Sequence, residues 1–139
     1  MAWITPVTDR GPGAMHTLDD QNRITNNINW LTTNARAKQL YTGANLQKVT
    51  YVNNYYITTA NWADIINVIK ALTTQLNVRQ TGAISNDMTF SNMNTVESMI
   101  LAIYEKYQQA TKQSANNHYT NDNIYAEADK SIYSAGLAE

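Results

Sequence analysis

The chain has 139 residues, a length that fits one domain or one domain with arms. It contains no cysteine, which excludes disulfide scaffolds, thiolate zinc sites and cysteine nucleophiles. Ten Lys and Arg against 11 Asp and Glu give a formal net charge of -1, so the cationic excess that nucleic-acid binding requires is absent.

The polarity of the chain comes from amides and hydroxyls rather than from charge. Charged residues make up 15%, against about 25% in typical soluble domains, while the sequence holds 18 Asn and 17 Thr. Such hydrogen-bonding faces favour a packed assembly over a freely diffusing enzyme. No apolar run approaches the roughly 18 residues of a membrane span, and the amino terminus lacks a basic region followed by an apolar stretch. We therefore expect neither membrane insertion nor an ordinary secretion signal.

Residues 1–14 are expected to form an extended arm. This segment carries both prolines of the chain and two of its five glycines, which disfavour a helix. Exposing the side chain of Trp3 to water is unfavourable, so the arm should dock either on its own bundle or on a neighbouring subunit.

Apolar spacing predicts a mainly α fold, a three-helix bundle over residues 15–112. The first helix begins at Thr17, whose spacing from Asp20 is that of a variant capping box, and the second begins at Thr58 or Thr59. The third begins near Ser91 and has Glu97 on its polar side. The expected core positions are Ile24, Ile28, Leu31 and Ala35, then Trp62, Ile65, Ile66, Ile69, Leu72 and Leu76, then Met93, Val96, Ile100, Ile103 and Tyr107.

A weak internal repeat relates the three helices. When Thr17, Thr58 and Thr89 are set in register, aliphatic residues recur seven, 11 and 14 positions later in each helix. The unequal distances between the three threonines favour three similar helices joined by different loops over a regular solenoid.

The segment 49–58 joins the first two helices and has two interpretations. Its β-prone runs flank Asn53 and Asn54, which tolerate the positive φ of a tight turn, so a small β-hairpin is one of them. The other is an extended crossover whose tyrosines pack on the bundle. Residues 80–87 are expected to form a loop.

Residues 113–139 are expected to form a second arm. The polar stretch 114–123 is expected to interrupt helical structure. Residues 124–135 are expected to form a short helix with Gly136 as its C-cap. Neither arm has enough large aliphatic residues for a core of its own.

The candidates for chemistry are few. His16 and His118 lie in expected loops without patterned carboxylates, and both are interpreted as solvated. Asp19 and Asp20 are interpreted as helix-capping acids. We expect no catalytic residue, no metal and no cofactor, and the chain is not predicted to be an enzyme. Asn22 and Asn94 either bond neighbouring helices or occupy first turns, and we favour first turns.

Aromatic residues are the stronger candidates for contacts with partners. Nine Tyr and three Trp against one Phe are typical of partly buried interface residues. A cluster of Tyr51, Tyr55, Tyr56 and Trp62 also suits stacking on sugars, although Trp30 and Trp62 are more simply read as core or boundary residues. The candidate interface residues are Trp3, Pro6, Arg10, Tyr51, Tyr55, Tyr56, Ile124, Tyr125 and Tyr133.

Three short segments carry a resemblance to a known family. They are Trp3-Ile4-Thr5-Pro6-Val7-Thr8-Asp9, then Leu18-Asp19-Asp20-Gln21-Asn22-Arg23-Ile24 with Asn26-Asn27-Ile28-Asn29-Trp30-Leu31, and Met93-Asn94-Thr95-Val96-Glu97-Ser98. Their order and spacing resemble small tail or baseplate-region proteins encoded by phages and prophages of Gram-positive bacteria. Val7, Arg10 and Gln21 stand where that pattern has Lys, Trp and Tyr.

The resemblance implies a structural component of the virion tail, at the tail tip, the baseplate or the fibre attachment. It implies that the chain is made in the bacterial cytoplasm, forms homo-oligomers and contacts other tail or baseplate proteins. From the charge balance we expect no contact with nucleic acid. The alternative is a carbohydrate-binding module that contacts saccharides of the host cell wall.

Overall fold

The computed structural model describes residues 2–53, 55–80, 82, 84–85 and 89–127, with the backbone alone from 113 onwards. Its described residues form three helices, α1 (Leu18–Ala37), α2 (Thr59–Gln75) and α3 (Phe90–Glu127), and no strand. The chain divides into two compact units, residues 1–107 and residues 108–139. The first unit contains α1, α2 and the first half of α3, which confirms the helical bundle. None of the helices in the described part of the chain is both long and apolar enough to span a bilayer.

Each helix begins after a threonine. The Thr17 hydroxyl accepts the Asp20 N–H at 3.1 Å, and the Asp20 carboxylate accepts the Thr17 N–H at 2.9 Å, so the predicted capping box is present. Thr58 and Asn61 form the same reciprocal pair at the start of α2. At the start of α3, the Thr89 hydroxyl accepts the Asn92 N–H at 3.2 Å.

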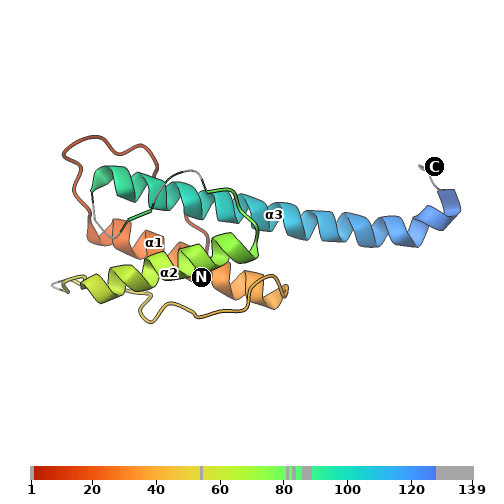
Figure 1. Cartoon of the computed structure of the whole chain (residues 1–139), viewed down its shortest axis with the longest axis horizontal. Helices are drawn as coiled ribbons and strands as arrows, with labels where there is room; N and C mark the ends of the chain where they lie inside the picture. The colour runs from red at the N-terminus through yellow and green to blue at the C-terminus, as the bar shows by residue number, and fades with distance from the viewer. Residues whose placement is uncertain (1, 54, 81, 83, 86–88, 128–139) are drawn as a thin grey trace. The chain divides into compact units, whose positions relative to one another are not determined.

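The three helices begin at the same end of the bundle and run in parallel through it (Figure 1). Two contacts between α1 and α3 confirm the parallel direction. Arg23 of α1 bonds Glu97 of α3, and two turns further along both helices Trp30 contacts Tyr104. Parallel neighbours require connections that return along the bundle. Residues 38–58 and 76–89 are these connections, which explains their length.

The internal repeat is expressed in the core. Since each helix rises about 1.5 Å per residue, positions seven, 11 and 14 after the threonines lie about 10, 16 and 21 Å along it. At these positions all three helices place aliphatic side chains in one buried core cluster, and each such side chain stabilises the fold by about 1.5–3 kcal/mol when fully buried. The residues are Ile24, Ile65 and Val96; Ile28, Ile69 and Ile100; and Leu31, Leu72 and Ile103, all at most 1% exposed.

The β-hairpin interpretation of residues 49–58 is wrong. The described residues of this segment contain no strand, and the Tyr55 N–H donates to the Val52 carbonyl at 3.2 Å in a turn. Of its tyrosines, Tyr51 is buried while Tyr55 and Tyr56 are exposed. The backbone N–H of Tyr51 donates to Asn22 Oδ1 at 2.7 Å, and Asn22 Nδ2 donates to the Tyr51 carbonyl at 2.9 Å. A helix side chain thus takes the place that a second strand would have in a hairpin.

The carboxyl-terminal stretch differs from the sequence prediction. Helix α3 continues through residues 114–123, where a polar break was expected, and ends at Glu127. It contains neither glycine nor proline, and its Asn, Ser and Thr residues each disfavour a helix by less than about 0.7 kcal/mol. Ile124 and Tyr125 are in this helix, whereas residues 128–139, Tyr133 among them, lie outside the described residues.

Candidate functional site

The amino-terminal arm lies against α1 and α3 of its own bundle. Near its start, the Trp3 ring stacks on Tyr104, with centroids 3.9 Å apart and planes 8° apart. Trp3 also meets the edge of Trp30 at 5.7 Å, and Trp30 in turn contacts Tyr107 at 5.5 Å. Aromatic pairs of this kind contribute about 0.5–1.5 kcal/mol each beyond their buried area. Of the two docking sites expected for Trp3, the structure shows the one on its own bundle.

Two asparagines bind the backbone of the arm. Asn27 Oδ1 accepts the Ile4 N–H at 3.0 Å, while Asn27 Nδ2 donates to the Ile4 carbonyl at 2.7 Å. Asn94 makes the same pair of bonds with Arg10, both at 3.0 Å. Each carboxamide therefore satisfies the donor and the acceptor of one arm residue, as an adjacent strand does in a sheet. We call this two-bond pairing an amide clamp.

Amide clamps also hold the other connections of the bundle. Among the described residues, three clamps join a helix side chain to the backbone of a connection: Asn22 with Tyr51, Gln75 with Thr42, and Asn92 with Ser85. Our interpretation that Asn22 and Asn94 only occupy first turns is therefore corrected. These bonds give part of the high Asn content of the chain a structural role.

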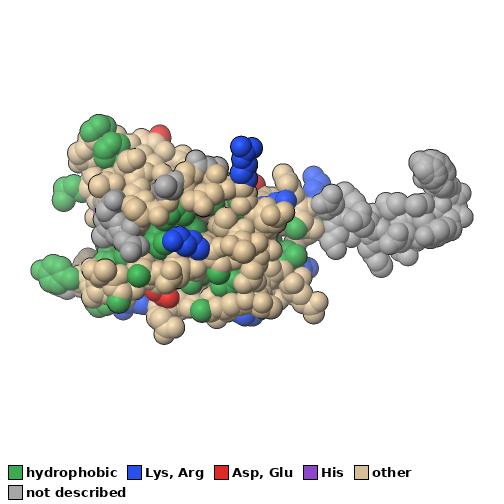
Figure 2. Space-filling view, viewed as in Figure 1, with side chains coloured by type: hydrophobic (Ala, Val, Ile, Leu, Met, Phe, Trp, Pro, Cys, Tyr) green, Lys and Arg blue, Asp and Glu red, His purple; other side chains and the backbone are tan. Residues whose placement is uncertain are grey.

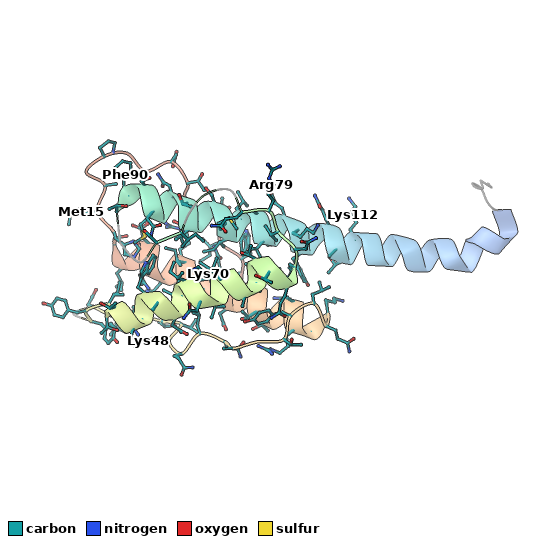
Figure 3. All side chains as sticks on the ribbon, viewed as in Figure 1. Met15, Lys48, Lys70, Arg79, Phe90 and Lys112 are labelled. Atoms are coloured by element: carbon teal, nitrogen blue, oxygen red, sulfur yellow. The ribbon has the colours of Figure 1, made fainter. Side chains whose placement is uncertain are left out.

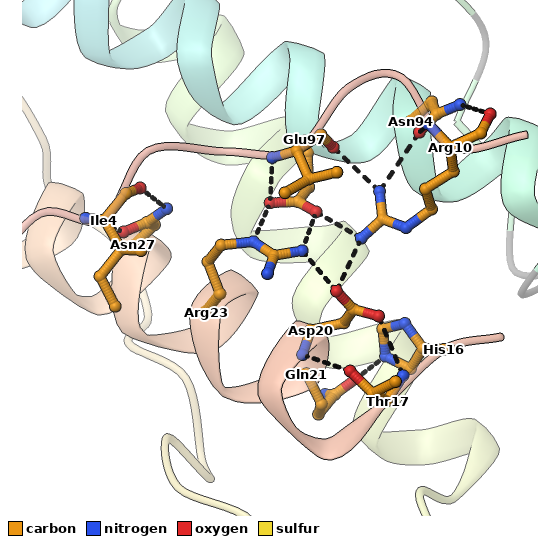
Figure 4. A network of polar contacts seen from close by, with 11 residues as sticks. Ile4, Arg10, His16, Thr17, Asp20, Gln21, Arg23, Asn27, Asn94 and Glu97 are labelled. Atoms are coloured by element: carbon orange, nitrogen blue, oxygen red, sulfur yellow. Dashed lines mark hydrogen bonds and ion pairs between the residues drawn. The ribbon is translucent and has the colours of Figure 1, made fainter. Parts of the chain in front are cut away.

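The middle and end of the arm are held by ionic contacts centred on Glu97 of α3 (Figure 4). Glu97 is fully buried and accepts from Arg23 Nε at 2.8 Å, Arg23 Nη2 at 2.7 Å and Arg10 Nη2 at 2.5 Å. It also accepts the backbone N–H of Val7 at 3.2 Å. Arg23 Nη2 bonds Asp20 at 2.6 Å, and Arg10 lies 3.5 Å from the same oxygen. Two cations face two carboxylates, so burying Glu97 leaves no unbalanced charge.

The charges of this network shift two pKa values. Burial raises the pKa of Asp20, but hydrogen bonds from Thr17 and Arg23 outweigh it and lower the pKa to about 2. The Arg23 pKa is raised, chiefly by its hydrogen bond to Glu97 and against the effect of burial. Both groups therefore keep their charges far into acid and alkali.

Glu97 and His16 differ from their sequence interpretations. Glu97 was placed on the polar side of its helix but is buried, because the arm covers that side. His16 was interpreted as solvated but is half-buried, with Nε2 2.7 Å from Gln21 Oε1 and its ring 6.3 Å from that of Trp62. Burial lowers the pKa of His16, and its Nδ1 has no hydrogen-bond partner among the described residues. The side chain of His118 lies outside the described residues.

The candidate interface residues fall into three groups. Trp3, Pro6 and Arg10 belong to the docked arm, where Pro6 is half-buried and the Arg10 side chain is 6% exposed. Tyr51 is 3% exposed, so it does not offer a face to a partner. Tyr55 and Tyr56 are 40% and 88% exposed. The side chains of Ile124, Tyr125 and Tyr133 lie outside the described residues.

The proposed aromatic platform is only partly accessible. Trp62 is 2% exposed and packs in the core together with the helix aliphatics, which confirms the core interpretation of that residue. Lys48 Nζ lies 4.4 Å from the ring centre of Tyr55 and 5.3 Å from that of Tyr51. The lysine side chain therefore covers part of the remaining aromatic surface.

The contacts of the arm join the three segments that carry the family resemblance. The first segment supplies Ile4 and Val7, the second supplies Arg23 and Asn27, and the third supplies Asn94 and Glu97. Arg10, which stands where the resembled pattern has Trp, adds a second cation beside Glu97. The described residues contain no group of three or more His, Asp or Glu side chains arranged to hold a metal. The arrangement fixes a peptide segment, and we assign no catalytic step to it.

No protein-family model matches the chain, and no curated protein or solved structure matches it either. The contacts described above, together with the resemblance of the three segments, are therefore the basis for a functional proposal.

Proposed function

We propose that this chain is a structural component of a phage or phage-like tail, at the tail tip, the baseplate or the fibre attachment, and that it acts through protein–protein assembly. The observation that carries the proposal is the meeting of the three resembling segments in one set of contacts around Glu97 and Asn27. The first and second segments each bond the third across 90 and 74 residues of sequence, which gives the order and spacing of the segments a shared structural reason. This supports a common fold more strongly than three unrelated short likenesses do.

The surface of the bundle also suits an assembly component. On the face shown in Figure 2, charged side chains are few and stand apart, and most of the described surface is neither charged nor hydrophobic. Met15, just before α1, is 82% exposed. Sparse charge lowers the electrostatic cost of close packing between copies.

Purified particles from the phage or lysogen that encodes the chain provide the test. Mass spectrometry should find the chain in the particles in a fixed ratio to other tail proteins, and gold-labelled antibody should mark one end of the tail in electron micrographs. A chain that is abundant in the lysate but absent from the particles would instead be a host-directed protein made during infection.

The exposed tyrosines favour a second candidate function, that of a carbohydrate-binding module. Tyr56 is 88% exposed and can offer a ring face to a sugar, whereas Tyr55 is 40% exposed and has Lys48 Nζ 4.4 Å from its ring centre. This candidate predicts binding of cell-wall saccharides that Tyr55→Ala or Tyr56→Ala abolishes, with Thr59→Ala as an exposed control. A glycan array and calorimetry without any binding by the unaltered chain would exclude it.

A further inference from the structure

A defined turn connects the arm to α1. The Ala14 N–H donates to the Gly11 carbonyl at 3.1 Å, with Pro12 and Gly13 between them. Gly13 has a φ of 84°, which is the conformation required at the third position of a type II turn, and proline is favoured at the second. Residues 11–15 are exposed, and a Cβ added at either glycine meets no atom within 4 Å. The turn, rather than packing around it, directs the arm back onto its own helices.

The binding site of the arm is built by the helices alone. Trp30, Asn27, Asn94 and Glu97 all belong to α1 or α3. None of residues 2–14, all of which the structure describes, is part of the buried core. The arm is therefore a peptide docked on a finished site, and every contact it makes is equally available to the same residues of another molecule.

We propose that the arm is exchanged between copies, so that the site on α1 and α3 takes up residues 2–10 of a second molecule of this chain. The bonds to Asn27, Asn94 and Glu97 are the same in both arrangements, and only the course of the turn differs. Exchange of an identical element is a low-cost route to assembly. In dilute solution a molecule's own arm occupies the site because its local concentration is high. Exchange therefore increases where copies are crowded. In this respect the inference rests on the proposed assembly function.

Two full-length variants with one thiol each make exchange visible. The chain has no cysteine, and the Ala2 carbonyl accepts from Asn26 Nδ2 at 2.7 Å, so these residues are neighbours when the arm is docked. Ala2→Cys and Asn26→Cys are mixed at high concentration and oxidised. A matched mixture replaces Asn26→Cys with Lys70→Cys on an exposed part of α2 (Figure 3). Exchange predicts disulfide-linked heterodimers at about ten times the yield of the matched mixture. Equal yields in the two mixtures would overturn the inference.

The two glycines of the turn provide a second comparison. Gly13→Ala places a side chain at positive φ and strains the turn, whereas Gly11→Ala has open space and no such restriction. Combined with Ala2→Cys, Gly13→Ala should raise the heterodimer yield several-fold, and Gly11→Ala should leave it unchanged. An unchanged or lower yield with Gly13→Ala would contradict the role of the turn. Because the crosslinking uses purified protein, absence of the chain from particles would refute the tail function but not arm exchange. Equal crosslinking yields would refute arm exchange but not the tail function.

Discussion

Arg23 and Glu97 are joined by two parallel hydrogen bonds across α1 and α3, from Nε to Oε1 at 2.8 Å and from Nη2 to Oε2 at 2.7 Å. This bidentate geometry is the strongest form of an arginine–carboxylate contact. It fixes the relative height of the two parallel helices and provides the acceptor that Val7 and Arg10 of the arm require.

Glu97→Gln should strongly destabilise the fold. The variant keeps the shape of the side chain but leaves the mostly buried Arg10 and Arg23 with Asp20 as their remaining carboxylate partner. Removing one member of a buried ionic network costs about 3 kcal/mol or more. Urea unfolding followed by circular dichroism measures the loss. Glu105→Gln on the exposed side of α3 is the control and should change the free energy of unfolding by less than about 0.5 kcal/mol. Equal stability of the two variants would contradict the description of Glu97 as the centre of the network.

Asn27→Ala should release the start of the arm. Both backbone groups of Ile4 lose their partner, which costs about 1–3 kcal/mol. The expected signs are faster proteolysis within residues 2–10 and a shift of tryptophan emission to longer wavelength as Trp3 leaves Tyr104. Asn67→Ala, at an exposed position of α2, should leave both measurements as they are in the unaltered chain. An arm that is equally protected in both variants would show that the amide clamp does not hold it.

His16 should make the protein less stable in mild acid. Its pKa in the folded chain is lowered from 6.5 by burial, so below pH 6.5 the unfolded chain binds a proton that the folded chain resists. The free energy of unfolding therefore falls as the pH drops from 6.5 toward the lower folded pKa, and this contribution is fully retained above 6.5. Asp20, Glu97 and Arg10 also act on this histidine, the two acids opposing the shift and the arginine adding to it.

Urea unfolding at about pH 7.5 and about pH 5.5 measures this dependence. His16→Gln cannot be protonated in this range and should show a smaller loss of stability between the two conditions than the unaltered chain. An identical loss in both proteins would assign the acid sensitivity to other groups.

The helices and their core could be predicted from local spacing. Thr17 and Thr58 cap helices through bonds to residues three positions away, and the aliphatic stripes follow from the helical period, so both signals are contained in short windows. The three equivalent threonines predicted similar helices for the same reason. The parallel direction was not contained in these windows, because it depends on the course of the long connections.

The contacts of the arm could not be predicted in the same way. Whether Asn94 caps a turn or binds a backbone depends on Arg10, which is distant in sequence and reaches α3 only after folding. The burial of Glu97 likewise depends on Arg10 and Arg23. For residues 49–58, β propensity did not reveal that Asn22 of α1, rather than a second strand, would bond the backbone of Tyr51.

Amide hydrogen exchange measured residue by residue by NMR tests the amide clamps most directly. The N–H groups of Ile4, Arg10, Thr42 and Tyr51 donate to side-chain amides and should exchange slowly although they belong to no helix. The neighbouring N–H groups of Thr5 and Thr50, for which the described residues provide no acceptor, should exchange fast. Fast exchange at Ile4 and Arg10, equal to that at Thr5, would contradict the claim that asparagine side chains hold the arm on the bundle.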